Sequence, residues 1–193
     1  MDEEDENHNP TGKRVTTNDY GSADYYYVNK SSLPKVYGGF NTSLSWKGFD
    51  LSAIFAYSIG GYIYNRDITM ILHNGSLEGR DWSTEILKRW TPDNRNTDVP
   101  ALSTTTNNWN SASTRFLQNN SYMRLKNLTL SYNLPKQWIS KLSLSSVQVY
   151  VQGDNLFTIH RNQGLDPEQG ITGITYYRYP AMRTISGGIN VSF

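Results

Sequence analysis

The sequence lacks several features that point to common classes of protein. It has no cysteine, which is compatible with an oxidising compartment, where stray thiols are a liability. No apolar run approaches the roughly 20 residues that a transmembrane helix needs. Its 18 basic and 17 acidic residues give a net charge of +1, which indicates neither nucleic acid nor an acidic surface as a partner. We therefore expect no nucleic-acid partner.

Residues that could form a catalytic centre are also scarce. The three histidines (His8, His73 and His160) all fall in segments that we expect to be loops, and no nucleophile stands beside a base. We expect His8 and His73 to be solvated. The chain is therefore not predicted to be an enzyme, and we expect no catalytic residue, metal site or cofactor.

The N-terminal segment, residues 1–35, is polar and has no sustained period, so we predict an irregular, extracellular loop. Its acidic run, residues 2–6, is predicted to be a solvated face, and it is the opposite of the cationic start of a signal peptide. If the protein is exported, its signal lies outside this sequence. We therefore expect the chain to be a piece of a longer protein.

Aromatic residues are abundant, with 14 Tyr, 5 Trp and 6 Phe, and many of them lie in segments that alternate between apolar and polar residues. This period of two predicts half-buried strands. The predicted strands are residues 36–46, 49–59, 122–134, 147–153 and 184–193. The third breaks its alternation near Met123 and Leu125, which predicts a bulge or the point where the strand leaves a membrane. Residues 81–90 have the spacing of a short helix that Thr91-Pro92 would end.

The connections between these strands are in turn short, long, short and long. Outer-membrane barrels have short periplasmic turns and long outer loops, with aromatic girdles at both boundaries. The aromatic residues at the expected boundaries fit two girdles: Trp46, Phe49, Tyr132, Trp138 and Phe193 at the short-turn end, and Tyr57, Tyr62 and Tyr122 at the other. Residues 36–193 are therefore predicted to be all-β, an antiparallel transmembrane β-barrel segment of about five strands with long extracellular loops.

A secreted β-sandwich that binds glycans or acts as an adhesin is the alternative, because its strands also alternate. Its hairpins would not be expected to switch so regularly between short and long. Five strands cannot close a barrel, since even small barrels use about eight. The barrel interpretation thus requires partner strands from outside this sequence.

Longer local patterns carry a resemblance to a known family. They occur in the family's order and cover most of residues 33–193: "SLPKVYGGFNTSLSWKGFDLSAIFAYSIGG", "RWTPDNRNTDVP", "NNSYMRLKNLTLSYNLP", "VQVYVQGDNLFTIHRNQGLDPE" and "YPAMRTISGGINVSF". The chain resembles the C-terminal part of the SusC/RagA family of TonB-linked outer-membrane transporters.

The resemblance implies a function and a set of partners. Such transporters consist of a large barrel with an N-terminal plug, capped by a SusD-like surface lipoprotein, and import glycans or peptides with energy from TonB–ExbB–ExbD. It implies the cell outer membrane of a Gram-negative, Bacteroidetes-type organism as the location. The partners expected are the missing N-terminal strands and plug of the same parent, the SusD-like lipoprotein, TonB–ExbB–ExbD through that plug, the barrel-assembly machinery and outer-membrane lipid.

The last strand carries the most specific candidate site. Phe193 ends an alternating strand whose residues Ile189 and Val191 are predicted to face lipid. Such an ending resembles the C-terminal signal that the barrel-assembly machinery recognises, and an edge strand can be captured by β-augmentation. An ordinary girdle aromatic is the alternative role for Phe193.

Several loop segments contain further candidates. The turn Asp166-Pro167-Glu168 lies near His160 and could support acid–base or metal chemistry, but we favour carboxylates that cap or bridge loop backbone. Residues 93–98 superficially suggest calcium ligands, yet they lack the EF-hand's central Gly and terminal Glu, so we predict a turn.

Aromatic and basic loop residues are a candidate ligand-contact set, because aromatic faces stack on sugar rings; loop packing is the favoured alternative. These residues are Trp109, Tyr176, Tyr177, Arg178 and Tyr179.

Overall fold

The computed structural model describes most of the chain. The described residues are 2–4, 10–15, 17, 19–73, 75, 77, 79–103, 110–142, 144–164, 166–168, 171–175 and 177–193. The chain divides into two compact units, each described by itself below. The sheet unit comprises Ser31–Ile63, Gln118–Gly173 and Arg178–Phe193, and the loop unit comprises Met1–Lys30, Tyr64–Leu117 and Ile174–Tyr177.

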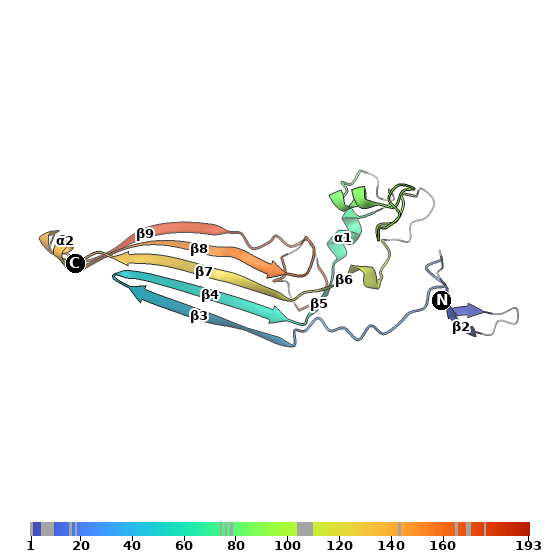
Figure 1. Ribbon diagram of the computed structural model, residues 1–193, viewed down its shortest axis with the longest axis horizontal. Coiled ribbons are helices and arrows are strands. Elements are labelled where there is room, and N and C mark those ends of the chain that lie inside the picture. Colours follow the sequence, from blue (N-terminus) through green and yellow to red (C-terminus); the bar gives the residue numbers. More distant parts are fainter. Residues whose placement is uncertain are drawn as a thin grey trace. The chain divides into compact units, whose positions relative to one another are not determined.

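The sheet unit is built on one five-stranded antiparallel sheet (Figure 1). Its strands, in spatial order, are β3 (Val36–Trp46), β4 (Phe49–Ile59), β7 (Tyr122–Asn133), β8 (Ser146–His160) and β9 (Thr184–Ser192). Each strand pairs with the next one of this set along the chain, and among the described residues the sheet does not close on itself. The predicted all-β class and antiparallel barrel segment are confirmed.

Four of the five predicted strands agree with the structure to within about one residue, but the fourth was predicted too short. It continues beyond Gly153 to His160, so the following loop begins at Arg161 and His160 is a strand residue rather than a loop residue. The sequence Gly153-Asp154-Asn155 is typical of a turn. Instead, Asn155 takes a φ of 51°, which asparagine tolerates, and one extra residue is accommodated in β8 opposite Leu125–Asn127.

The break of alternation in β7 is a bulge. Asn127 pairs with Ile54 and Leu125 pairs with Phe55, which leaves Lys126 as the extra residue. The bulge moves Met123 and Leu125 onto the same face as Leu128. The first of the two explanations that the sequence left open is therefore the right one.

At the short-turn end, the β3–β4 hairpin turns on Lys47 and Gly48, both with positive φ (47° and 89°), as a two-residue turn requires. The β7–β8 connection contains α2 (Lys136–Ile139) and η3 (Ser140–Leu142). Figure 1 shows α2 and the C-terminus at the same end of the sheet as the β3–β4 turn.

The remaining elements are short. They are β1 (Asp2–Glu4), β2 (Pro10–Arg14), β5 (Tyr62–Tyr64), α1 (Arg66–Ile71), η1 (Thr84–Lys88), η2 (Thr114–Phe116) and β6 (Leu117–Asn119). β1 and β2 pair in a segment that was expected to be irregular. Within the predicted helix 81–90 the structure has only the 3-10 turn η1, capped by the Ser83 side chain. Among the described residues, no helix is long and apolar enough to cross a membrane.

Candidate functional site

One face of the sheet is apolar from edge to edge. The strand register places the apolar residues of all five strands opposite one another, for example Leu44 with Leu51, Leu51 with Leu130, Leu130 with Val151 and Val149 with Ile189. Many of these side chains are exposed, with 67% for Leu44 and 64% for Ile189. A contiguous apolar surface of this kind marks contact with a partner or a membrane.

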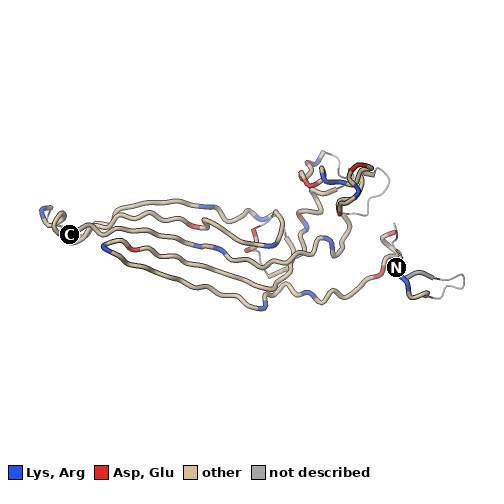
Figure 2. The backbone as a smooth tube through the Cα atoms, in the orientation of Figure 1, with Lys and Arg blue, Asp and Glu red and all other residues tan. Residues whose placement is uncertain are grey.

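Charged side chains avoid this face. The Asp, Glu, Lys and Arg residues within the five strands are Asp50, Arg124, Lys126 and Asp154, and Figure 2 shows how few they are along the sheet. By register, Asp50, Arg124 and Asp154 lie on the opposite, polar face. The Lys126 ammonium pairs with Glu168, as the Arg124 guanidinium does. The sheet therefore separates an apolar side from a side that carries its charges.

Aromatic side chains gather at the short-turn end of the sheet unit. Trp46 pairs in register with Phe49. The ring centroids of Phe49 and Tyr132 lie 4.5 Å apart. Trp138 is 63% exposed, and Phe193 is 92% exposed. These are the residues that the sequence placed in a girdle.

The polar face carries a ladder of hydrogen bonds that crosses all five strands near the short-turn end. Ser45 on β3 donates to Asp50 on β4, whose other oxygen accepts from Asn133 on β7 at 2.7 Å. Asn133 accepts from Gln148 on β8 at 3.1 Å, and Gln148 accepts from Asn190 on β9 at 3.2 Å. Each rung bonds its neighbour, so the ladder favours this register of strands.

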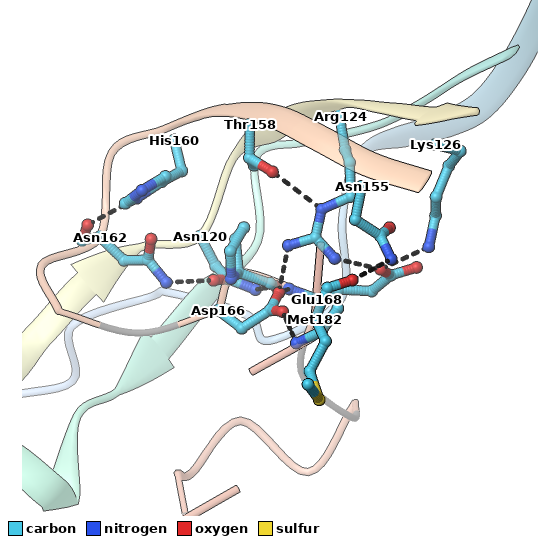
Figure 3. A network of polar contacts seen from close by, with 12 residues as sticks. Asn120, Arg124, Lys126, Asn155, Thr158, His160, Asn162, Asp166, Glu168 and Met182 are labelled. Atoms are coloured by element: carbon cyan, nitrogen blue, oxygen red, sulfur yellow. Dashed lines mark hydrogen bonds and ion pairs between the residues drawn. The ribbon is translucent and has the colours of Figure 1, made fainter. Parts of the chain in front are cut away.

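At the long-loop end, a buried ion pair fastens a loop to the polar face (Figure 3). Arg124 on β7 donates to Asp166 at 2.5 Å and to Glu168 at 2.7 Å, and its Nε donates to Thr158 on β8. The side chains of Arg124 and Asp166 are only 4% and 7% exposed. Lys126 adds a second partner to Glu168, at 2.6 Å. Planar, multidentate pairing of this kind suits an arginine in a buried position.

Asp166 also joins the two limbs of its own loop. Its Oδ1 accepts from the backbone N–H of Glu168, and its Oδ2 accepts from that of Ala181 at 2.6 Å. Burial raises the pKa of the Asp166 carboxyl, but the hydrogen bonds from Arg124, Ala181 and Glu168 outweigh this effect and hold the pKa below its ordinary value. Asp166 is therefore ionised at neutral pH and acts as a structural acceptor.

These contacts bear on the two interpretations of the Asp166–Glu168 turn. The Asp166 carboxylate bridges loop backbone, as we favoured, and both carboxylates pair with Arg124, a partner that sequence spacing did not reveal. His160 Nδ1 lies 2.8 Å from the Asn162 carbonyl oxygen. Within the described ranges, no group of three His, Cys, Asp or Glu residues could hold a metal ion.

The predicted turn lies at residues 91–94, at the start of the segment 93–98. Thr91 and Asn94 form an isolated bridge, and the Asn94 amide donates to the carbonyl oxygen of Lys88 at 2.9 Å. This amide thus helps to fix the chain after η1.

His73 was expected to be a solvated loop residue, and this expectation was wrong. Its side chain is 1% exposed, and its Nδ1 accepts from the Trp82 indole N–H at 3.0 Å and from the Gly75 backbone N–H at 3.3 Å. Gly75 and Trp82 therefore both bind the imidazole ring. His8 lies outside the described residues.

The other predicted site residues are placed as follows. Ile189, Val191 and Phe193 are exposed (64%, 44% and 92%), and the first two lie on the apolar face. In the ligand-contact set, Tyr177 and Tyr179 are 66% and 88% exposed, and Arg178 is exposed. Trp109 and Tyr176 lie outside the described residues. The backbone N–H of Tyr177 donates to Asp67, which anchors this stretch beside α1.

Comparison with known proteins relates the chain to TonB-dependent receptors, although no family model matches it. It is 35% identical over 166 residues to TonB-dependent receptor P3 of Formosa agariphila, which covers 80% of this chain and 16% of that protein. It is 28% identical over 168 residues to the TonB-dependent receptor SusC of Bacteroides thetaiotaomicron, which covers 86% of this chain and 16% of SusC.

Solved structures agree with these relatives. The RagAB peptide importer in its closed-closed state matches with a TM-score of 0.78 and 34% identity, over 99% of this chain and 20% of that chain. The RagAB peptide transporter matches with a TM-score of 0.72 and 36% identity over 86% of this chain. This chain thus spans only 16% to 20% of the relatives' length. It belongs to the SusC/RagA family of TonB-dependent receptors.

Proposed function

We propose that this chain forms part of the barrel wall of an outer-membrane transporter that imports glycans or peptides. The single observation that carries the proposal is the two-faced sheet, with an exposed apolar side that runs across five strands and a polar side that holds the charges. In a membrane barrel the apolar side faces lipid and the polar side faces the interior.

The edges of the sheet support the proposal that further strands complete the wall. Among the described residues, β3 pairs only with β4 and β9 only with β8, which leaves two open edges. In lipid, each unpaired backbone group would cost several kcal/mol or so. The missing N-terminal strands of the parent protein are the proposed partners of both edges, and its plug would occupy the interior.

The remaining partners follow from family membership. A SusD-like surface lipoprotein would cap the barrel, and TonB–ExbB–ExbD would supply energy through the plug, in the outer membrane of a Gram-negative, Bacteroidetes-type cell. RagAB, which is similar to this chain, is described as a peptide importer. Trp109, Tyr176, Tyr177, Arg178 and Tyr179 are the proposed contacts with the ligand, because aromatic and guanidinium groups suit both sugars and peptides.

Assembly of the barrel is the proposed role of the last strand. β9 is an edge strand of nine residues with no charged side chain, and it can add to another sheet through its backbone. Phe193 would anchor it to the barrel-assembly machinery, with Ile189 and Val191 on the same side.

A matched pair of variants tests the proposed facing in the full-length parent. Val191→Lys would place a charge on the lipid side, at a cost of up to about 2–4 kcal/mol, depending on depth. Asn190→Lys, one residue away, would place it in the interior and be tolerated. The measurement is the amount of heat-modifiable, folded protein in outer membranes. Equal amounts for the two variants would remove the basis of the proposal.

The β-sandwich alternative makes a different prediction for the purified chain. A sandwich would bury the apolar face against a second sheet and remain soluble, whereas a piece of barrel wall requires detergent. A monomeric chain that unfolds cooperatively without detergent would therefore favour the sandwich.

A further inference from the structure

The turn Asp166–Pro167–Glu168, here called the acidic turn, lies on the polar side of the sheet. Its main partner, Arg124, pairs in register with Ala56 on β4 and with Thr158 on β8. Both partners lie on the face opposite to Phe55 and Phe157, because neighbouring residues of a strand alternate. The acidic turn therefore approaches the sheet from the side that carries the charges.

The burial of neighbouring side chains gives independent evidence for this placement. At the same level of the sheet, Phe157 and Ile159 on the apolar face are 49% and 58% exposed, whereas Arg124 on the polar face is 3% exposed. Something therefore covers the polar face alone. Pro167 is itself buried, and the carboxylates of the acidic turn contact the Arg124 guanidinium directly, so the turn supplies at least part of the cover.

Several separate contacts hold the acidic turn in this position (Figure 3). The Pro167 carbonyl oxygen accepts from Asn120 at 2.8 Å, just before β7, and Asn120 in turn accepts from Asn162 at 3.1 Å. On the return limb, Ala181 donates to Asp166, and the Met182 carbonyl oxygen accepts from Asn155 on β8. The turn is thus tied to β7, to β8 and to both limbs of its own loop.

We infer that the acidic turn lines the interior of the conduit at its long-loop end and narrows the path of the transported solute. Arg124 is a positioning residue that holds the turn there. This inference rests on the proposed function, because the polar face is the interior only in a barrel. A loop that extended freely outward from the strand ends would leave Arg124 uncovered.

The partly exposed groups of this cluster are those that a passing solute would meet. The side chains of Lys126 and Glu168 are 33% and 37% exposed, whereas those of Arg124 and Asp166 are nearly buried. The buried pair Arg124–Asp166 therefore fixes the position of the acidic turn. The partly exposed pair Lys126–Glu168 presents one positive and one negative group to the interior.

Cysteine cross-linking in the full-length parent tests which side of the wall the acidic turn occupies. Pro167→Cys is combined either with Ala56→Cys, on the polar face, or with Phe55→Cys, on the apolar face, and a short flexible bis-maleimide is added to outer membranes. We expect at least about fivefold more cross-linked product for the Ala56 pair, because side chains at 55 and 56 point to opposite faces. More product for the Phe55 pair, or equal product, would overturn the inference.

A second measurement tests the role of Arg124. A bulky, membrane-impermeant maleimide is expected to label Pro167→Cys about tenfold faster or more in the Arg124→Gln background. Removal of Arg124 breaks the buried ion pair, and the acidic turn is then no longer held against the sheet. The matched control Lys126→Gln removes a partly exposed charge and should change the rate by less than about twofold. Equal rates in the two backgrounds would overturn the positioning role, and rescue by Arg124→Lys would support it.

Failure of the inference is distinguishable from failure of the proposed function. Heat-modifiable migration of the parent shows whether a barrel forms at all. A folded barrel without the Ala56 cross-link contradicts the inference alone, whereas a parent that never forms a barrel contradicts the proposed function.

Discussion

Replacement of Arg124 by Gln is the perturbation whose size the structure defines best. Arg124 as a whole residue is 3% exposed. Its guanidinium donates hydrogen bonds to Asp166, Glu168 and Thr158. Breaking a buried ion pair by removing one partner costs about 3–5 kcal/mol. Asp166 would keep its two backbone donors, Glu168 and Ala181, so we expect a loss near the lower end, about 3 kcal/mol.

A double-mutant cycle separates the pair from its surroundings. Asp166→Asn removes one buried charge, and Arg124→Gln with Asp166→Asn removes both, so the double variant should lose less stability than the sum of the single variants. Lys126→Gln is the control, because its ion pair with Glu168 is partly exposed and is expected to contribute about 0–1 kcal/mol.

Hydrogen exchange of the full-length parent in lipid nanodiscs provides the assay. The peptides to follow contain the Glu168 and Ala181 amides, which both donate to Asp166. A loss of about 3 kcal/mol corresponds to exchange that is roughly 100-fold faster at these amides. If Arg124→Gln changed their exchange no more than Lys126→Gln did, the buried pair would not hold the loop, and the reasoning would be refuted.

Two further predictions concern pH and packing. The pKa of Asp166 is lower in the folded protein than its ordinary value of 3.8, so its ionised form stabilises the fold; this contribution is complete above about pH 3.8 and is lost as pH falls through the lower, folded pKa. Exchange at Ala181, corrected for its intrinsic pH dependence, should therefore stay constant from pH 7 to pH 5 and rise only below about pH 3.8, and a rise at pH 5–6 would contradict this assignment. Gly39→Ala should destabilise the parent by about 1–3 kcal/mol, because its Cβ would lie 2.8 Å from the Phe55 carbonyl oxygen. Gly187→Ala, whose Cβ would lie 3.3 Å from the Tyr150 carbonyl oxygen, is the milder control, and equal shifts of the urea midpoint would show that the close approach at Gly39 is unimportant.

Much of the sheet could be predicted from alternation alone. β3 and β4 were predicted residue for residue, because a two-residue Lys47-Gly48 turn separates two uninterrupted alternating runs. The prediction of β8 ended at Gly153 because a long loop was expected from Asp154 onward, whereas a positive φ at Asn155 keeps these residues within the strand. Local residue preference could not reveal this, since neighbouring strands supply the pairing.

The contacts that fasten the loops could not be predicted from local sequence patterns, because tertiary structure brings their residues together. Arg124 and Asp166 are 42 residues apart in the chain, and nothing in their spacing pairs them. One signal was available: an arginine on the polar face of a predicted strand requires a partner if it becomes buried. His73 was misjudged for a similar reason, because its burial depends on Trp82, which the folded loop brings to it.

Spin-label scanning of β9 in the membrane-embedded parent tests the central claim most directly. Nitroxides are attached to single cysteines at each position from 185 to 192, and their collisions with oxygen, which partitions into lipid, are compared with those of a water-soluble nickel chelate. The account predicts oxygen maxima on the apolar face, at Ile185, Gly187, Ile189 and Val191. It predicts nickel maxima on the polar face, at Ser186, Gly188, Asn190 and Ser192. A profile without this period of two, or one with the two sets exchanged, would contradict the account.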